Sequence, residues 1–470
     1  MVFSSPVFLF IFLPVCLFCY LLTNLFGNIK AENICLLIFS LVFYAYGSLD
    51  FLPVLLVSIV LNYLLSKGID SVRSDELRGV LFFLSMLLNI SLLFIYKYLN
   101  LFSGFIFGAE NATNIKLPIG ISFYTFQVLS YLADVYRRDV KSCKSIIDFA
   151  LFTMLFPQLI AGPIVRYSTI ENELKSRRTK FTSFSDGIMR FMIGFSKKIL
   201  LANALGKIAD LAFAQLTYYT MGPLLSMMVI VCYSMQIYLD FWAYSDMAIG
   251  IGKIFGFSFP ENFNMPFLST SITEFWTRWH ISLSSFFRDY VYIPLGGSRK
   301  GLLITCINLT IVFALSGFWH GASFNFLFWG FYNAFFLVIE RIIKSKTKSK
   351  IYIPQTIGIL YVFIVWNVGM ILFRLENFAD IVEFLKGAFS YPVFNYSTRK
   401  LVDEVFNPYF IVCFVVSVLY LTPFFDKIKD ALYKTKIGFI IVDIAVVVLF
   451  IYSVIEMLTS GFNPFIYFRF

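Results

Sequence analysis

Charged residues and histidines are scarce in this 470-residue chain. Asp, Glu, Lys and Arg together make up 14% of the sequence, and there are two histidines. Soluble globular domains carry about 25% charged residues, so the composition excludes an ordinary soluble fold. The seven cysteines are scattered, mostly inside apolar runs, with no paired spacing that suggests a metal site. They indicate small buried hydrophobic side chains, with no metal or disulfide pattern.

Internal repeats, low-complexity tracts and long polar linkers are also absent. We therefore expect one integral domain over residues 1–470, with short connections. The strict alternation of polar and apolar residues that marks a membrane β-barrel is missing as well, which leaves helices as the spanning elements.

Apolar residues dominate instead. They make up 59% of the chain, aromatic residues 20%, and the mean hydropathy is +0.79. A helix crosses a bilayer with about 20 apolar residues, and such runs recur along the chain. The clearest are 7–26, 80–99, 223–242, 351–373 and 437–458. We expect an all-α, polytopic membrane protein with roughly eleven to thirteen helical segments by this criterion. The first run is expected to be retained as a span, since no Lys or Arg precedes Lys30 and no small-residue cleavage site follows the run.

The net charge of +10 comes from basic residues in the loops between apolar runs. The preference of Lys and Arg for the cytoplasmic side, together with anionic lipid, explains this charge without nucleic acid. The rule places the chain start and 103–116 outside, and 66–79, 136–144, 341–350 and 426–436 inside. The basic stretch 166–180 conflicts with a full crossing before it, so we expect a re-entrant segment built on Pro157, Gly162 and Pro163.

The block 245–301 is too polar to span a membrane and too apolar to be an ordinary loop. Ser271 and Glu274 have the spacing of a capping box, which predicts a helix that ends before Pro294. One face of this helix would carry Trp276, His280, Leu283 and Phe287, and the other Arg278, Ser282, Ser285 and Asp289. The pattern predicts an amphipathic helix in the membrane interface or packed against the bundle.

Each of the two histidines, His280 and His320, directly follows a tryptophan. Imidazole exchanges protons near neutral pH, and apolar surroundings favour its neutral, proton-accepting form. An ionisable group at membrane depth is a functional candidate, so we expect His320 to serve as a general base. The alternative is a buried histidine with one interhelical hydrogen bond. For His280, an interfacial helix that carries a histidine at little cost is equally compatible with the sequence.

Other polar residues give weaker signals. We expect Asp246 to orient an imidazole, to bind a backbone amine or to cap the following helix. It lies six residues after Asp240, so the two carboxylates do not share a helical face. We expect Arg166 either to hold a phosphate or carboxylate bidentately or to anchor its segment at the lipid headgroups. The stretch "GIGKIFG" is better explained by helix packing than by phosphate binding. Neither an activated nucleophile nor a metal-binding cluster is evident.

Several motifs, in order along the whole chain, resemble the membrane-bound O-acyltransferase (MBOAT) family, in its bacterial branch of alginate and peptidoglycan O-acetylation. They are "FWTRWHISLSSFFRDYVYIPLGGSRKG", "GFWHGASFNFLFWG", "LPIGISFYTFQVLSYLADVYRRD", "FPQLIAGPIVRY", "YSDMAIGIGKIFGFSFPENFNMPF" and the terminal "NPFIYFRF". The resemblance implies a ring of helices with re-entrant and interfacial segments. It also implies that His320 is catalytic and that His280 is the second signature residue. Thr277 departs from the arginine expected there, which puts in doubt any donor contact assigned to that position.

The resemblance further implies acetyl transfer from a cytoplasmic thioester, acetyl-CoA or an acyl carrier, to a hydroxyl at the outer face of a bacterial cytoplasmic membrane. A separate extracytoplasmic acetyltransferase or the glycan itself would be the partner, and no cofactor would be covalently bound. The residues expected to position the substrates or shape a tunnel are Trp319, Trp276, Arg288, Asp289, Asp246 and Arg166. The alternatives are a D-alanyl or other acyl transferase of the family, and a transporter or scaffold without chemistry.

Overall fold

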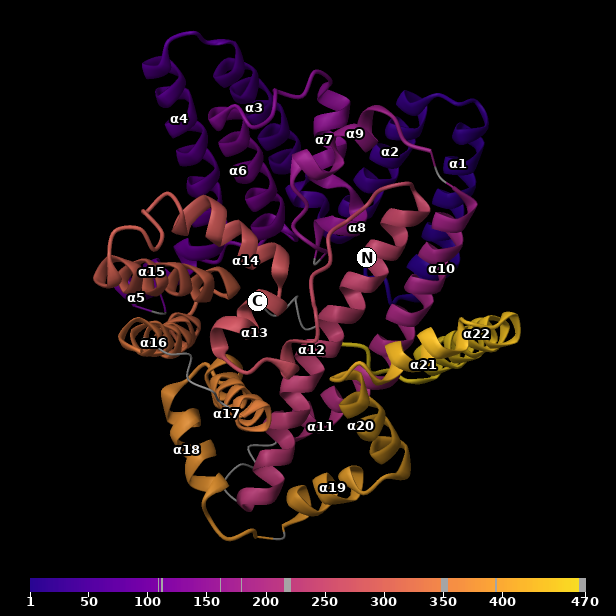
Figure 1. The fold of residues 1–470 in the computed structure, drawn as a ribbon, viewed down its shortest axis with the longest axis vertical. Coiled ribbons are helices and arrows are strands. Elements are labelled where there is room, and N and C mark those ends of the chain that lie inside the picture. The colour runs from indigo at the N-terminus through magenta and orange to yellow at the C-terminus, as the bar shows by residue number, and fades with distance from the viewer. Residues whose placement is uncertain are drawn as a thin grey trace. The chain divides into compact units, whose positions relative to one another are not determined.

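The computed structural model describes residues 1–108, 110, 113–160, 162–178, 180–214, 221–347, 354–393 and 395–464, and these ranges contain helices and no strand (Figure 1). Parts of the predicted loops 103–116 and 341–350, and of the terminal motif 463–470, lie outside them. The chain forms two compact units. Unit 1 comprises residues 1–191 and 245–261, and unit 2 comprises residues 192–244 and 262–470. The single domain expected over 1–470 stays a prediction.

Six helices of unit 1, α1 to α4, α7 and α8, begin at side-chain caps or prolines. Asn28 caps α2, Ser74 caps α4 and Ser145 caps α7 by accepting backbone N–H groups. The helices are α1 (Leu13–Leu25), α2 (Ile29–Ser48), α3 (Leu52–Ser71), α4 (Asp75–Leu93), α5 (Leu99–Phe107), α6 (Ile121–Arg137), α7 (Ile146–Met154), α8 (Phe156–Leu159), α9 (Tyr167–Lys175) and most of α10 (Phe181–Ser196). Short π-helical turns precede α1 and α5, at Phe8–Phe12 and Phe94–Tyr98.

A buried arginine ties the segments of unit 1 together. Arg177 lies 3.3 Å from the Glu32 carboxylate, and both side chains are almost completely buried. Its guanidinium also donates to the side chain of Asn33 and lies over the ring of Phe257. Burying a charge is tolerated only when it is paired and hydrogen-bonded, and these contacts meet that requirement.

The expected re-entrant region folds as short helices. α7 has nine residues and α8 has four, with Pro157 in the first turn of α8. Neither helix is long enough to cross a bilayer. A Cβ on Gly162 would lie 2.6 Å from the Cα of Gln158, so the chain turns back closely on itself here.

Unit 2 contains the remaining helices and all but two of the predicted site residues. Its elements are a π-helical turn (Lys197–Ala202), α11 (Asn203–Ala214), α12 (Gly222–Ile254, as far as residue 244), α13 (Ile272–Arg278), α14 (Ile281–Phe287), a second π-helical turn (Arg288–Tyr292), α15 (Leu302–His320), α16 (Phe324–Lys346), α17 (Gln355–Arg374), α18 (Phe378–Ala388), α19 (Tyr396–Val405), α20 (Pro408–Tyr420), α21 (Phe424–Leu432) and α22 (Lys436–Thr459). Aromatic side chains from α12, α13, α16 and α17 form the core of this unit.

Eight helical stretches in the described residues are long and apolar enough to cross a membrane, or nine if the bent pair Thr398–Val405 and Pro408–Tyr420 is one span. This is fewer than the eleven to thirteen segments expected. The main reasons are that α2 and α3 form one continuous 43-residue stretch and that α6, with 17 residues, is too short. The count still makes the chain a multi-pass membrane protein.

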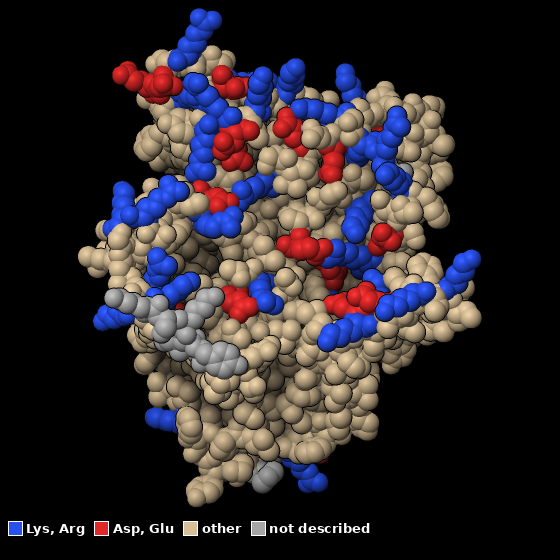
Figure 2. All heavy atoms as spheres, in the orientation of Figure 1, with Lys and Arg blue, Asp and Glu red and all other residues tan. Residues whose placement is uncertain are grey.

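The surface of unit 2 fits a lipid environment. Along α22, apolar side chains such as Ile440, Ile444, Val448 and Leu458 are exposed. In the face drawn in Figure 2, the region of unit 2 that carries α17–α20 shows few charged side chains. Apolar surface of this extent is stable in contact with acyl chains and not with water.

Candidate active site

The Trp-His-Gly motif ends one of two closely packed helices. His320 is the last residue of α15, and three residues connect it to α16. A Cβ on Gly317 would lie 2.2 Å from the carbonyl oxygen of Phe326, and one on Gly321 would lie 2.2 Å from the Phe326 ring. From the other side, a Cβ on Gly330 would lie 2.3 Å from the Phe313 carbonyl oxygen. The glycines of this motif therefore allow the close helix crossing that fixes the position of His320.

The His320 ring lies within an aromatic wall. Its centroid is 5.0 Å from the Trp319 ring, 5.2 Å from the Trp329 ring and 5.4 Å from the Phe373 ring. The residue keeps 8% of its surface exposed, whereas His280 keeps 1%. The His320 imidazole is therefore held among aromatic rings with little of its surface exposed.

The single helix expected from residue 274 to about 290 is wrong, because the chain breaks at Trp279 and His280. α13 ends at Arg278, His280 adopts a left-handed conformation with φ 44° and ψ 55°, and α14 begins at Ile281. The face predicted to join Trp276 and His280 to Leu283 and Phe287 therefore does not exist as one helical face. A left-handed conformation costs a non-glycine residue about 1–3 kcal/mol, and it is commonly found at functional sites.

A strap formed by residues 262–264 stabilises this break. The Asn262 carbonyl accepts from Ile281 N–H at 2.9 Å, and Asn264 N–H donates to the Arg278 carbonyl at 2.9 Å. The Asn262 side-chain oxygen lies 3.1 Å from His280 Nδ1. The same oxygen accepts from Ser282 N–H at 3.3 Å and from the Ser282 hydroxyl at 2.9 Å. Backbone and side chain of one asparagine thus define both the break and the imidazole orientation.

The His280 imidazole is held in an apolar environment. Burial lowers its pKa well below the ordinary value of 6.5, and the nearby His320 lowers it further, against a raising contribution from its own backbone carbonyl. The Phe241 ring packs 4.6 Å away, edge to face, and the Trp319 ring lies 6.0 Å away. His280 is therefore neutral at physiological pH.

A carboxylate on α16 anchors the start of α13. Ser271 caps α13 by accepting from Glu274 N–H at 3.1 Å, as the predicted capping box requires. The Glu274 carboxylate reaches Thr270 N–H and not Ser271 N–H. Glu340 accepts from Ile272 N–H at 2.7 Å and from Thr273 N–H at 2.9 Å. A negative charge at a helix N-terminus is stabilising, so Glu340 fixes α13 and its Trp276 against α16.

A cavity of about 1240 Å³ runs beside these elements. Its wall on α15 consists of Thr305, Leu309, Val312, Phe313 and Ser316, which share one face of that helix. Eleven residues of α-helix span about 16 Å. Ser316 lies one turn before His320, so the cavity runs along α15 toward the histidine.

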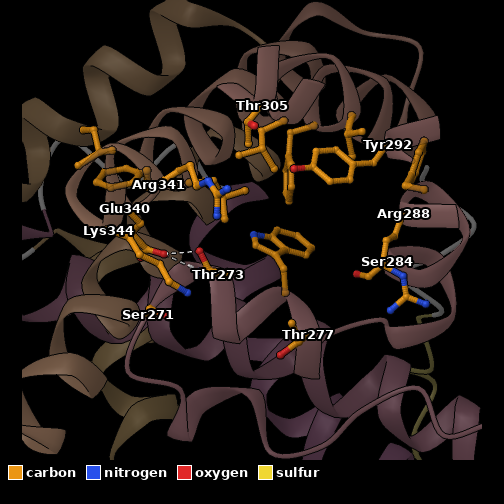
Figure 3. Close-up of a pocket in the computed structure, with 18 of the residues that line it drawn as sticks. Ser271, Thr273, Thr277, Ser284, Arg288, Tyr292, Thr305, Glu340, Arg341 and Lys344 are labelled. Atoms are coloured by element: carbon orange, nitrogen blue, oxygen red, sulfur yellow. Dashed lines mark hydrogen bonds between the residues drawn. The ribbon is translucent and has the colours of Figure 1, made fainter. Parts of the chain in front are cut away.

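Basic side chains lie at two sides of the cavity, and Trp276 lines it. In Figure 3, Glu340 and Lys344 with the neighbouring Arg341 are on one side, and Arg288 and Tyr292 are on the other. The Trp276 ring contacts Trp329 at 5.7 Å, and Trp329 contacts His320. Two aromatic rings thus connect the cavity wall to His320.

The other predicted residues are distributed between the two units. Arg288 and Asp289 pair with each other at 2.7 Å, and Arg288 is mostly exposed. Asp246 and Arg166 belong to unit 1. Asp246 lies inside α12, so it caps no helix, and it accepts from Arg190 at 2.8 and 3.0 Å. Arg166 is the residue before α9.

Two residues that the sequence analysis passed over organise the site. Asn262 lies in a quoted motif, and the only available signal was a polar side chain in the stretch between Phe259 and Phe263. Glu340 had no such signal, because its contacts are 67 and 68 residues away in sequence. Within the described ranges, no group of three or more His, Cys, Asp or Glu side chains is placed to hold a metal ion.

Comparison with known proteins shows the family of this chain. The sequence model of the MBOAT, membrane-bound O-acyltransferase family, matches residues 137–379. The probable alginate O-acetylase AlgI of Pseudomonas putida is 36% identical over the full length of both chains. The peptidoglycan O-acetyltransferase of Helicobacter pylori is 34% identical over 82% of this chain and 79% of its own. The teichoic acid D-alanyltransferase of Bacillus subtilis is 29% identical over 52% of this chain and 63% of its own. The chain therefore belongs to the membrane-bound O-acyltransferase family and is an O-acyltransferase.

Proposed function

We propose that the protein transfers an acetyl group from a thioester donor on the cytoplasmic side to a hydroxyl at the outer face of a bacterial cytoplasmic membrane. The observation that carries this proposal is the position of His320 at the end of α15, one helical turn beyond Ser316, the last residue of that helix that lines the cavity. The full-length similarity to an alginate O-acetylase supports the choice of an acetyl group.

The cavity is the proposed route of the donor. The loop with Arg299 and Lys300 precedes α15, and Lys344 and Lys346 end α16, so the positive-inside rule assigns this end of both helices to the cytoplasm. Arg341, Lys344 and Arg288 line the cavity and are suited to the phosphates of CoA or of a carrier-bound arm. The mostly apolar lining of the cavity then suits the thin, mostly neutral arm of the donor that leads to the thioester.

His320 would receive the acceptor from the other side. It lies 18 residues after the start of α15, and a helix of that length rises about 27 Å, close to the bilayer core thickness of about 30 Å. An alcohol from the outer face and a thioester from the cytoplasm would therefore meet near this residue.

The reaction would proceed by general-base catalysis. His320 takes the proton of the acceptor hydroxyl while its oxygen attacks the thioester carbonyl. The new C–O bond forms, the C–S bond breaks, and the thiolate leaves with the proton returned by the imidazolium. General-base help of this kind contributes about 10²–10⁴-fold. Positioning in the cavity supplies a further part of the rate, and the scheme uses only side chains and the two substrates.

The acceptor is proposed to be a cell-wall or extracellular polysaccharide such as peptidoglycan or an alginate-like glycan. The transfer is direct or relayed through a separate extracytoplasmic acetyltransferase. The names of the Pseudomonas and Helicobacter relatives support this class of acceptor. Transfer of D-alanine is the second candidate, because a teichoic acid D-alanyltransferase aligns with about half of the chain. Mass spectrometry of the product distinguishes the two groups.

The direct test in cells replaces His320 with alanine and measures ester-linked acetate on the cell wall and exopolysaccharide. We expect the acetate to fall to the level of a deletion strain at equal protein abundance. Unchanged acetate would remove His320 from the mechanism. A transporter or scaffold without chemistry would instead leave purified wild-type protein unable to form any ester from labelled acetyl-CoA and an acceptor.

A further inference from the structure

The Asn262 side chain has its orientation fixed by a backbone donor. The amide oxygen and nitrogen of an asparagine are assigned from their partners. Ser282 N–H can only donate, and it points at the Asn262 side-chain atom that also faces His280. That atom must therefore be the oxygen, since an amide NH2 there would face a second donor.

The tautomer of His280 follows from this orientation. An amide oxygen only accepts hydrogen bonds, so the His280 Nδ1 at 3.1 Å from it must carry the proton. In a neutral imidazole the other nitrogen then has a lone pair and no proton. His280 Nε2 is buried and has no hydrogen-bond partner among the described residues.

We propose that Asn262 is a positioning residue that holds His280 in its neutral form with the proton on Nδ1, so that Nε2 accepts a hydrogen bond from a substrate N–H or O–H. The catalytic consequence rests on the proposed function, whereas the tautomer does not. His280 in this form cannot donate from Nε2, which excludes it as a stabiliser of the developing oxyanion through that atom. The hydrogen bond that Nε2 accepts would come either from an N–H of the donor's arm or from the hydroxyl of the acceptor.

The groups around the ring are otherwise uncharged. Phe241 on α12 and Trp319 on α15 face the imidazole, and Asn262 lies on the strap. His320 on α15 is the one titratable group among the described residues whose charge acts on it. A carboxylate in place of the Asn262 amide would therefore be the dominant new influence on the protonation of His280.

The tautomer can be measured without any acetyl transfer, because the chain has two histidines. The protein is labelled with ¹⁵N-histidine, given a histidine-free tag, and carries His320→Gln so that His280 gives the only imidazole signals. We expect a proton on Nδ1 and none on Nε2. In Asn262→Asp we expect the titration of the ring to move to higher pH. A proton on Nε2, or an unchanged titration in Asn262→Asp, would overturn the proposal.

Activity variants with His320 intact test the consequence. Asn262→Leu removes the acceptor and should lower kcat/KM by about 10- to 100-fold, as loss of an orienting partner of a functional histidine does. An effect on the donor KM assigns Nε2 to the donor's arm, and an effect on kcat/KM for the acceptor assigns it to the hydroxyl. Asn262→Asp should recover activity at high pH and lose it earlier than wild type on acidification.

The matched control is Ser282→Ala, which removes another hydrogen bond to the same Asn262 oxygen and leaves the imidazole contact in place. We expect its rate to stay within about fivefold of wild type, since one neutral hydrogen bond contributes about 1 kcal/mol, which corresponds to a factor of about five. Equal rates for Asn262→Leu and Ser282→Ala would contradict the proposal. An inactive wild-type protein with the expected tautomer would instead count against the proposed function alone.

Discussion

Gly317→Ala tests whether the close crossing of α15 and α16 sets the position of His320. The added Cβ would lie 2.2 Å from the Phe326 carbonyl oxygen and 3.0 Å from the Cα of Gly330, whereas ordinary contacts begin near 3.4 Å. The difference, 3.4 − 2.2 = 1.2 Å, must be absorbed by moving backbone, because no flexible side chain is involved. We therefore expect α15 and α16 to separate by about 1 Å, at a cost of about 1–3 kcal/mol for overpacking.

The displacement should affect activity more than stability. His320 lies three residues after Gly317, nearly one helical turn, so it moves with the crossing. A misplacement of about 1 Å can reduce an enzymatic rate by about 100-fold. The assay compares the acetyl transfer rate and the thermal unfolding of the purified variant with those of wild type.

Gly79→Ala is the matched control. Gly79 lies inside α4, and a Cβ there would meet no atom within 4 Å. This change should leave the rate unaltered and stabilise the helix slightly, since alanine is favoured over glycine by about 1 kcal/mol. If Gly317→Ala behaved like Gly79→Ala in both measurements, the argument that this crossing positions His320 would be refuted.

Three further predictions concern other contacts of unit 2. Glu340→Ala should lower the free energy of unfolding by about 2–3 kcal/mol and slow transfer, because two backbone N–H groups lose a charged acceptor; thermal unfolding and rate assays check this. Asp240→Asn should destabilise by about 3–5 kcal/mol because the Lys198 ammonium, buried 2.9 Å away, loses its charged partner and keeps the Pro464 carbonyl, and adding Lys198→Met should recover part of the loss. Because burial lowers the pKa of His280, its contribution to stability is complete above pH 6.5 and is lost as the pH falls toward the folded-state pKa. His280→Gln should therefore flatten the pH dependence of thermal stability below pH 6.5.

The sequence predicted the features of this fold that depend on local pattern. Ser271 caps α13 as expected, because a capping box is a local signal. The Trp-His-Gly motif was expected to lie between two apolar runs, and His320 does end the apolar helix α15 three residues before α16 begins. The membrane class followed from composition alone, because a bilayer core accepts only apolar, self-bonded helices.

The break at His280 could not be predicted from helical periodicity. The residues 274–290 have an acceptable amphipathic pattern, and no glycine or proline marks the interruption. The left-handed conformation persists because the strap at Asn262, 18 residues earlier, hydrogen-bonds the backbone groups on either side of the break and the His280 ring. Such tertiary contacts override local preference. The role of Glu340 could not be predicted for the same reason, because its backbone partners lie 67 and 68 residues away in the sequence.

The pairing of acidic residues was also beyond the sequence. Asp246 was expected to orient an imidazole or to cap a helix, but the structure gives it Arg190 as a partner from 56 residues away. Spacing along a helix identifies neighbours on that helix and says nothing of the charge that a second helix supplies. The substrate-positioning roles expected for Arg166, Arg288 and Asp289 stay predictions.

The central claim is that the imidazole of residue 320 takes the proton from the acceptor hydroxyl. The most direct measurement is the initial rate of ester formation by purified, membrane-reconstituted protein given radiolabelled acetyl-CoA and a soluble glycan acceptor, with wild type and His320→Ala compared at equal folded protein. We expect a loss of at least about 100-fold in the variant. A variant that forms ester at the wild-type rate would contradict it.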